Sequence, residues 1–489
     1  MKHLSAHPTR EMLTGTLRVF LADMLILPSG LLTTAYLTRR LGPEGYGLFI
    51  LAATVVTWVE WSVVALFSRT TIKFVSEAPD WRPVGAAVVW LHLMISAAAM
   101  LLLAALAGPI AALLREPHLV SYLRLFSLDI PLFSLAQAHR NILVGLGGFR
   151  ERALASAARW LTRLFAIVLL VQLGFSIPGA IVGSIAASFV ELIIGRIYVR
   201  PSMWRPEGFS VQPLWGYAVP LLFAAVSLRL FDKLDLVTLK ALGASAEQAG
   251  NYGAAQSLAL VPGILALSFS PLLLSTVTRL LLSGEREAAR NLGRDAMRFV
   301  LGIFPFASLV AGAAPEIVRL VFGPRFLSAA APLSLLILGA VALMMISVAS
   351  AILIGASKPG WAVALAALLV PTALIGCLYF IPRWGVNGAA MATMLSAGGG
   401  AVASMLAVKR LWGRLPSVLT LLRSLLLSTL AYILAVSWKT PDILLLKLLV
   451  IFLLICGGYL VLGEFSISEK ALIRSLFSSP ARAKAGTGD

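Results

Sequence analysis

Apolar stretches of 20 or more residues recur along the whole chain, and they limit its fold more than any other feature. A helix of about 20 apolar residues spans the hydrocarbon core of a bilayer, which is roughly 30 Å thick. Only 13% of the 489 residues are charged, whereas about a quarter of the residues of a soluble domain are charged. We therefore expect an all-α polytopic membrane protein.

The apolar stretches predict about fourteen transmembrane helices joined by short connections. Their expected spans are 16–37, 46–68, 84–108, 119–143, 153–174, 177–199, 214–241, 250–278, 296–322, 328–355, 361–381, 386–408, 417–437 and 443–463. The longest polar connections are about 200–213 and 279–295, and the second is predicted to be an amphipathic cytoplasmic segment. The first span lacks a small-x-small cleavage site, so it is predicted to be a membrane helix and not a signal peptide.

Lysine and arginine residues gather on one side of the predicted membrane. Alternate connections place 23 of them on the side of both termini and 8 on the opposite side. Because cytoplasmic loops carry the excess of these residues, both termini are expected in the cytoplasm. Residues 38–45 are then expected to face outward.

Charge and cysteine content exclude two kinds of ligand. The formal net charge of +18 follows from the positive cytoplasmic loops, so we expect no nucleic acid as a partner. Cys377 and Cys456 lie in separate apolar stretches without the spacing of metal ligands. We therefore expect no metal site and no disulfide.

The chain contains a weak internal repeat. The matched pairs are LGPEGYGLFILAATVV (41–56) with LGASAEQAGNYGAAQSLALV (242–261), ILVGLGGF (142–149) with ILIGASKP (352–359), and Gly179 with Gly388. Tyr46 lies over Tyr252, and the three offsets are 206, 210 and 209 residues. The unit therefore has about 207 residues and six helices. Because six is even, both copies cross the membrane in the same sense, related by an axis along the membrane normal.

The repeat divides the chain into four predicted parts. These are an N-terminal lobe at 1–211, a C-terminal lobe at 212–414, two extra helices at 415–465 and a basic cytoplasmic tail at 466–489. The expected architecture is thus two parallel six-helix repeats that form a two-lobed transporter, with two extra C-terminal helices.

Charged residues inside the predicted helices are candidates for a transport site, because such charges are costly and usually face a cavity. The cations expected to bind substrate are Arg18, Arg124, Arg159, Arg163, Arg229 and Lys233. The carboxylates expected to balance charge or to couple transport to an ion are Asp23, Glu60, Asp129, Glu191, Asp232 and Asp235. The predicted helix 7, with the sequence SLRLFDKLDLVTLK, contains the most charged residues. The alternative to a cavity lining is that these charges neutralise one another in a salt-bridge seam packed against another helix.

Proline and glycine interrupt several predicted helices. The candidate hinge residues are Pro28, Gly30, Pro220, Pro262 and Gly263. Hinges there would allow two lobes to rock, and static packing kinks are the alternative.

The combination of these patterns resembles a known family. The turn LTRRLGPEGYGLF at 37–49, its echo GNYGAAQ, the helix ends NILVGLGGFRE and ILIGASKPG, and the six-plus-six-plus-two layout carry the resemblance. They resemble the polysaccharide (Wzx-type) branch of the multidrug/oligosaccharidyl-lipid/polysaccharide exporter superfamily. The resemblance covers essentially the whole chain, and it implies a V-shaped pair of lobes around a central cavity, with helices 1 and 7 facing each other.

The resemblance also implies a cargo, a location and partners. The cargo is an undecaprenyl-diphosphate-linked oligosaccharide, the repeat unit of an exopolysaccharide, O-antigen or capsule. A flippase of this kind translocates it across the bacterial inner membrane by alternating access. Membrane lipids and a polysaccharide polymerase or export machinery are the further expected partners, and a monomer is expected.

The predicted charges suit that cargo, because guanidinium groups bind the oxygen pairs of a diphosphate in a bidentate manner. No Walker-type phosphate loop is present in the sequence, so no nucleotide cofactor is expected. The carboxylates could couple transport to H⁺ or Na⁺. The membrane potential, worth about 2.3 kcal/mol per charge per 100 mV, could also drive an anion outward.

Three alternatives stay open at this stage. A lipid II flippase of the same superfamily also has fourteen helices, and a drug/cation antiporter of the superfamily usually has twelve. A membrane-bound polysaccharide polymerase or ligase needs a sizeable periplasmic loop with catalytic residues. Since no outward connection is long enough, we expect a transporter and not an enzyme.

Overall fold

A computed structural model describes residues 25–202, 212, 231, 233–438 and 443–464 of the chain. Every secondary-structure element in these residues is helical. In chain order the elements are α2 (Ile26–Glu77), α3 (Trp81–Leu113), α4 (Leu119–Ser127), α5 (Asp129–Gly145), α6 (Phe149–Leu170), η1 (Val171–Phe175), α7 (Ser176–Tyr198), α9 (Leu234–Ala241), α10 (Ala246–Ala259), α11 (Val261–Leu282), α12 (Arg286–Gly312), α13 (Ala314–Val321), η2 (Pro324–Ala329), α14 (Ala330–Gly355), α15 (Pro359–Trp412), α16 (Val418–Ser437) and α17 (Leu444–Val461).

Nine helical segments of the described chain are long and apolar enough to cross a membrane. They confirm the prediction of an all-helical polytopic membrane protein. Three of them, Pro28–Glu77, Phe149–Tyr198 and Pro359–Trp412, have 50, 50 and 54 residues, more than twice the length that one crossing needs. Each contains a glycine with positive φ, at Gly42, Gly174 and Gly385 respectively.

The long segments fold back at these glycines. On the two sides of Gly174, a Cβ on Gly183 would lie 2.7 Å from the side chain of Ile167. On the two sides of Gly385, a Cβ on Gly376 would lie 3.1 Å from the Cβ of Ala392. Both pairs are therefore in direct contact across antiparallel arms, and each long segment is a helical hairpin.

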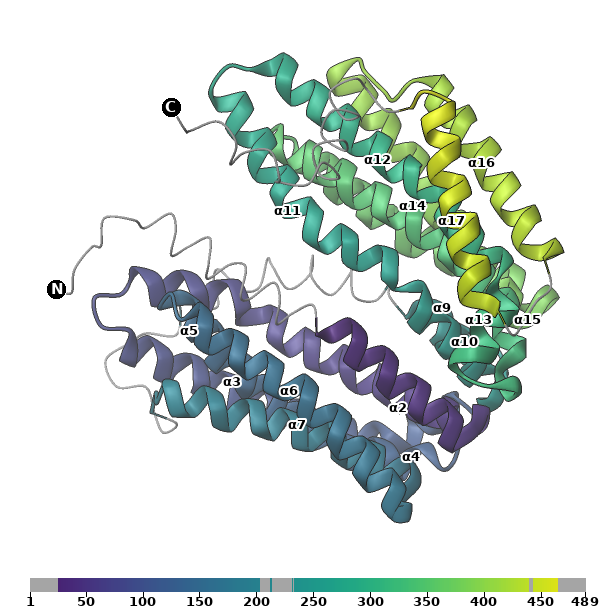
Figure 1. Ribbon diagram of the computed structural model, residues 1–489. Helices are drawn as coiled ribbons and strands as arrows, with labels where there is room; N and C mark the ends of the chain where they lie inside the picture. Colours follow the sequence, from purple (N-terminus) through teal and green to yellow (C-terminus); the bar gives the residue numbers. More distant parts are fainter. Residues whose placement is uncertain (1–24, 203–211, 213–230, 232, 439–442, 465–489) are drawn as a thin grey trace, which may run out of the picture.

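The helices form two lobes. Helices α2 to α7 pack together, and α9 to α17 form a second group (Figure 1). The groups meet near α4, α10 and α13 and diverge toward their opposite ends (Figure 1). The buried apolar residues of the described chain are distributed in the same way. One core contains residues of both lobes, such as Leu37 and Leu239, whereas three others belong to a single lobe each.

A close approach of two helix backbones joins the lobes. Helix α2 crosses α10 at Gly47 and Gly250. A Cβ on Gly47 would lie 1.8 Å from the carbonyl oxygen of Ala246, and one on Gly250 would lie 1.9 Å from that of Pro43. Only glycine permits backbones to approach so closely, as at small-residue contacts between other membrane helices. The stretch GPEGYG and its echo GNYG thus pack directly against each other.

Aromatic side chains surround this joint. Tyr46 and Tyr252 are buried, with 2% and 0% of their surface exposed. The ring of Tyr46 lies 6.2 Å from that of Phe326 in η2, in an edge-to-face arrangement, and Phe49 stacks on Phe126 of α4 at 6.3 Å. The joint is therefore a dry apolar contact between the lobes.

Residues with positive φ recur at nearly constant spacing in the helix connections. Gly42, Arg115, Gly147 and Gly174 have counterparts at Gly243, Gly323, Ser357 and Gly385. The offsets are 201, 208, 210 and 211 residues. The chain thus reverses direction in similar ways at equivalent points of the two halves.

Several predicted boundaries differ from the observed ones. The predicted turn at 38–45 lies within the bounds of α2, where the chain folds back at Gly42 without a separate non-helical segment. The polar segment 279–295 is not a separate element, because α11 and the first turns of α12 leave only residues 283–285 between them. The predicted span 119–143 is broken at Leu128, and the span 250–278 is broken at Leu260. Apolar patterning marks each span but not these interruptions, which involve one residue each.

The last two described helices are fastened to the second lobe by ion pairs near both ends. The Lys447 ammonium of α17 is fully buried and lies 2.8 Å from the Glu316 carboxylate of α13. Glu464, just after α17, pairs with Arg298 of α12 at 3.3 Å and with Arg423 of α16 at 2.9 Å. These pairs hold α16 and α17 on the outside of α12.

Replacement of Gly47 by alanine tests the joint. Since the added Cβ would overlap the Ala246 carbonyl, α2 and α10 must separate, and the free energy of unfolding should fall by about 1–3 kcal/mol. Thermal unfolding in detergent measures this effect. Gly399→Ala is the matched control, because that position has open space around it. Equal stability of the two variants would show that the helices do not rely on this contact.

Candidate functional site

Five of the predicted site residues come together inside the N-terminal group of helices. They are Glu60 of α2, Asp129 of α5, Arg159 and Arg163 of α6, and Glu191 of α7. Glu60 lies midway between Gly42 and the end of α2, so this N-lobe cluster occupies the middle of the predicted membrane. Ionisable groups at that depth are expensive and usually functional.

Helix periodicity brings these side chains to one place. Arg159 and Arg163 are four residues apart on α6 and therefore share a face. That face packs against α7, where Glu191 points back: its Oε2 lies 3.3 Å from Nη1 of Arg159. A carboxylate buried to 1% exposure requires such a partner, because an unpaired buried charge costs several kcal/mol.

Arg140 of α5 belongs to the same N-lobe cluster, although the sequence analysis did not select it. Its Nη1 lies 3.6 Å from Oε1 of Glu191, and its guanidinium also contacts the Gln137 and Ser156 side chains. The signal that could have found it is its place near the inner end of an apolar helix, three residues after Gln137.

The N-lobe cluster is layered by charge. Its carboxylates are the most buried members, with Glu60, Asp129 and Glu191 only 5%, 3% and 1% exposed. The side chains of Arg140 and Arg159 keep 19% and 14% exposure. The cations are thus the accessible layer, and the anions lie behind them.

Aromatic rings hold the Arg159 guanidinium in place. Its Cζ lies 4.3 Å from the ring centroid of Phe133 and 5.6 Å from that of Trp160. Cations over aromatic faces gain about 0.5–2 kcal/mol and lose freedom of orientation. Arg159 is therefore fixed between Glu191 and these rings.

A second polar cluster lies in the other lobe around Asp235 of α9. Its Oδ1 accepts hydrogen bonds from the Leu236 amide and the Gln256 amide group, both at 2.8 Å. Its Oδ2 accepts from the Tyr252 hydroxyl at 2.5 Å and the Thr393 hydroxyl at 2.8 Å. Asp235 is 5% exposed and fully hydrogen-bonded, so it lies inside the packed helices of the lobe.

Lys233 extends the Asp235 network. Its ammonium donates to Oε1 of Gln256 at 2.7 Å, while the amide group of the same Gln256 donates to Asp235. The sequence predicted Asp235 and Lys233 as site residues but did not find their partners. Tyr252 and Gln256, four residues apart on α10, were matched only as part of the repeat.

Two polar contacts connect the lobes beside the glycine joint. Lys240 of α9 donates to Oε1 of Glu116, in the α3–α4 connection, at 2.7 Å. The Arg39 guanidinium of α2 donates to the carbonyl groups of Leu320 and Val321, at the end of α13. Each contact joins one lobe to the other. We call these two contacts the outer lock.

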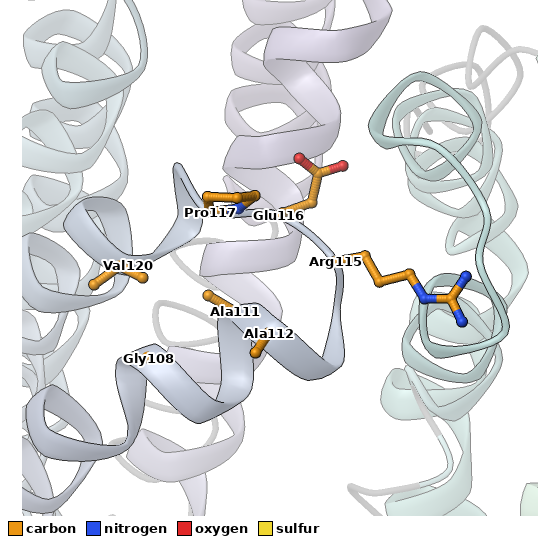
Figure 2. Close-up of a pocket in the computed structure, with 7 residues that line it drawn as sticks. All are labelled: Gly108, Ala111, Ala112, Arg115, Glu116, Pro117 and Val120. Carbon is orange, nitrogen blue, oxygen red and sulfur yellow. The ribbon is translucent and has the colours of Figure 1, made fainter.

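A surface hollow of about 460 Å³ lies beside the outer lock, between α3 and α4. Its lining includes small residues such as Ala111 and Ala112, together with the side chains of Arg115 and Glu116. Figure 2 shows Arg115 reaching away from this hollow toward the teal chain of the other lobe, where a Cβ on Gly243 would lie 3.0 Å from its Nη1. None of the residues that line the hollow belongs to the N-lobe cluster.

The remaining predicted residues are distributed as follows. Arg124 of α4 is exposed and directed to the backbone carbonyl of Ala104, apart from the N-lobe cluster. Pro28 and Gly30 lie near the start of α2, and Pro262 and Gly263 lie in the first turn of α11, directly after the break at Leu260. Arg18, Asp23, Pro220, Arg229 and Asp232 lie outside the described residues. Within the part of the chain that the structure describes, no group of three or more His, Cys, Asp or Glu could hold a metal ion.

Comparisons with known proteins agree with this architecture. The sequence profile of the family described as "Polysaccharide biosynthesis protein" matches residues 12–273. The chain is 28% identical over 241 residues to the succinoglycan biosynthesis transport protein ExoT of Rhizobium meliloti (strain 1021). That alignment covers 48% of this chain and 47% of ExoT, so the match spans about half the length of this relative.

Solved structures of two transporter groups have a similar fold. The lipid II flippase MurJ, in an inward closed conformation, superposes with a TM-score of 0.72 at 17% identity, covering 95% of this chain and 100% of MurJ. A point mutant of the Vibrio cholerae MATE transporter VcmN gives a TM-score of 0.59 at 15% identity, covering 82% of this chain and 96% of VcmN.

Charge exchange tests the Glu116–Lys240 pair of the outer lock. Lys240 is 2% exposed, so Glu116→Gln should leave its charge poorly compensated and destabilise the protein by roughly 3 kcal/mol, the low end for a broken buried pair. Exchange of the two residues, Glu116→Lys with Lys240→Glu, should recover most of that loss. Thermal unfolding measures both variants, and additive losses in the double variant would contradict the pairing.

Replacement of Asp235 by asparagine tests the second cluster. The amide group of asparagine is itself a donor, so at least one of the Tyr252, Gln256 and Thr393 donors would lose its acceptor. Each buried group left without a partner costs about 1–3 kcal/mol. We expect lower abundance in the membrane and a lower unfolding temperature. Normal abundance with lost transport would instead indicate direct contact with the cargo.

Proposed function

The chain belongs to the polysaccharide biosynthesis protein family of membrane transporters, and we propose that it flips an undecaprenyl-diphosphate-linked oligosaccharide across the bacterial inner membrane. The movement would follow alternating access of the two lobes. The fold is that of the multidrug/oligosaccharidyl-lipid/polysaccharide exporters, and the chain is a transporter and not an enzyme. The ExoT relative is named for succinoglycan transport, which supports a glycan cargo.

We infer fourteen membrane crossings in two parallel six-helix repeats and a final pair. Three hairpins among the nine apolar segments supply six crossings and not three, and α10 with α11 supplies a further broken one, which brings the count to thirteen. The fourteenth is the predicted span 214–241, of which the structure describes residue 231 and residues 233–241, including α9. The constant spacing of the positive-φ connections supports the repeat. The proposed parts remain 1–211, 212–414, 415–465 and 466–489, with both ends in the cytoplasm.

The observation that carries the proposal is the charge layering of the N-lobe cluster. Three arginines, Arg140, Arg159 and Arg163, adjoin three more deeply buried carboxyl groups. Guanidinium groups bind diphosphate oxygens through paired hydrogen bonds, and a site of reduced dielectric strengthens them. An anionic headgroup would meet the arginines first.

The same layering separates this function from its closest rival. A drug/cation antiporter needs accessible carboxylates, whereas here the carboxylates lie behind the cations. The lipid II flippase has a similar fold, so the fold alone does not separate that cargo from a glycan repeat unit. We favour the glycan repeat unit because the family profile and the ExoT relative both concern polysaccharide synthesis.

The cargo has three chemically different parts, and each has a place in the proposal. The diphosphate binds the arginines, the sugars pass through the wet space between separated lobes, and the prenyl tail stays in the surrounding lipid. An inside-negative potential favours outward movement of the anion by about 2.3 kcal/mol per charge per 100 mV. On the outer side a polysaccharide polymerase or export machinery would receive the product of a monomeric flippase.

Substitution of Arg163 tests the headgroup site. Arg163→Gln should reduce export of the lipid-linked oligosaccharide by about tenfold or more, because a charge-assisted hydrogen bond contributes about 1.5–3 kcal/mol. Arg163→Lys should restore part of the export, since it keeps the charge but not the paired donors. Leaflet accessibility of the oligosaccharide, normalised to the protein level by immunoblot, measures both.

Arg290→Gln is the control for these variants, because Arg290 lies near the start of α12 and pairs with Glu287 at 3.2 Å. Its export should match that of the wild type. Full export by a stable Arg163→Gln protein would remove Arg163 from the proposed site.

A further inference from the structure

Two carboxyl groups of the N-lobe cluster are not used by any ion pair found among the described residues. Glu60 of α2 and Asp129 of α5 lie next to each other, and each acts on the charge of the other. Oε1 of Glu60 and Oδ1 of Asp129 are buried and accept no hydrogen bond. Both residues are at least nine-tenths buried, at 5% and 3% exposure.

The surroundings of the pair are polar but incompletely bonded. The hydroxyl of Ser188, on α7, lies beside Asp129, is fully buried and has no hydrogen-bond partner of ordinary geometry. The Nε atoms of Arg159 and Arg163 are also buried without a partner. Thus donors and acceptors from α2, α5, α6 and α7 face one another without forming a closed network.

The charged groups that face the pair come from each of these helices. Helix α6 contributes Arg159 and Arg163, which both attract the two carboxyl groups. Farther inward, Glu191 of α7 and Arg140 of α5 neutralise each other in part. Tyr46 of α2 adds a hydroxyl group near Arg163. The local charge therefore depends on whether one or both carboxyl groups of the pair are ionised.

We propose that Glu60 and Asp129 share a single exchangeable proton, and that the diphosphate binds when this proton is present. The second half of the proposal rests on the proposed function. The proton moves between water and one carboxyl oxygen, so an O–H bond forms on binding and breaks on release, and no other bond changes.

Electrostatics gives the direction of this coupling. Two adjacent buried carboxylates repel each other, so the pair titrates as a unit that favours one proton over none. With the proton present, the three arginines of the cluster face two negative charges, one on Glu191 and one on the pair. The cluster then has a net positive charge, which attracts an anion. Without it, the carboxylates balance all three arginines and compete with the diphosphate. Proton and anion therefore bind together, the opposite of the competition between protons and a cationic cargo.

Asp235 in the other lobe shows why the pair is distinctive. It accepts four hydrogen bonds from the Leu236, Gln256, Tyr252 and Thr393 donors. Donors therefore already occupy both of its carboxylate oxygens. The lobes thus hold one saturated and one unsaturated carboxylate site, and the exchangeable proton belongs to the unsaturated one.

Infrared spectroscopy of the purified protein in nanodiscs tests for the proton without any cargo. A protonated carboxyl group has a carbonyl stretch that a carboxylate lacks. We expect a band that disappears as the pH is raised and that is missing from both Glu60→Gln and Asp129→Asn. Glu287→Gln, at an exposed carboxylate of α12, should keep it. A spectrum in which neither substitution removes a titrating band would overturn the shared proton.

Binding of farnesyl diphosphate at a series of pH values tests the coupling. For one linked proton the affinity of the wild type should fall by up to about tenfold per pH unit across the range in which the infrared band disappears. Both substitutions at the pair should remove that dependence, whereas Glu287→Gln should retain it. The titration of the probe itself is common to all four proteins and cancels in the comparison.

The outcomes separate the two proposals. Binding of equal pH dependence in the wild type and the pair variants would overturn the coupling while leaving the diphosphate site intact. A titrating band that depends on Glu60 and Asp129, together with no binding of farnesyl diphosphate, would uphold the proton site and contradict the proposed function. Thermal unfolding of each variant shows that the comparison is made on folded protein.

Discussion

The contact of α2 with α10 at Gly47 and Gly250 is the constraint on which the rest of the structure depends. Because neither residue has a Cβ, two backbones meet there, and the lobes are joined over a small area at one end. The outer lock, formed by Lys240 with Glu116 and by Arg39 with the end of α13, lies around the same point. The lobes diverge away from this joint (Figure 1), and any motion of one lobe against the other must therefore alter it.

The two lobes have similar connections but different polar interiors. In the second lobe, Asp235 is surrounded by donors and contributes to packing. In the first lobe, Glu60 and Asp129 lack such donors and face arginines that are partly accessible. Strongly bonded polar groups stabilise a lobe, whereas incompletely bonded ones leave room for a ligand or an ion. The proposed binding site accordingly lies in the first lobe.

The sequence predicted the helical membrane architecture because long apolar stretches have one structural solution in lipid. It also named Glu60, Asp129, Arg159, Arg163 and Glu191 among twelve candidate site residues, since intramembrane charges are rare and stand out. It did not predict which of these would meet, because that depends on the rotation of four helices about their own axes.

Other features had no clear signal in the sequence. Lys240 and Glu116 resemble ordinary loop charges, and their pairing depends on how the lobes meet. Lys447 is an exception, because a single charge within an apolar stretch stands out in the sequence. Its partner Glu316 lies 131 positions away in the chain. The turn at 37–49 was predicted only as a connection, whereas its glycines form the joint, because tight turns and close helix contacts require the same residue. Arg18, Asp23, Pro220, Arg229 and Asp232 stay predictions.

The most direct test of the account follows both ends of the lobes at once. Spin labels at Ser76 and Ser283 report the separation at the diverging ends, and labels at Glu44 and Gln248 report the separation beside the joint, all at exposed positions. Double electron–electron resonance would be recorded with and without the lipid-linked oligosaccharide. Rocking about the joint predicts that the cargo shortens the first distance and lengthens the second in the same fraction of molecules. A first distance that shortens while the second stays unchanged would contradict it.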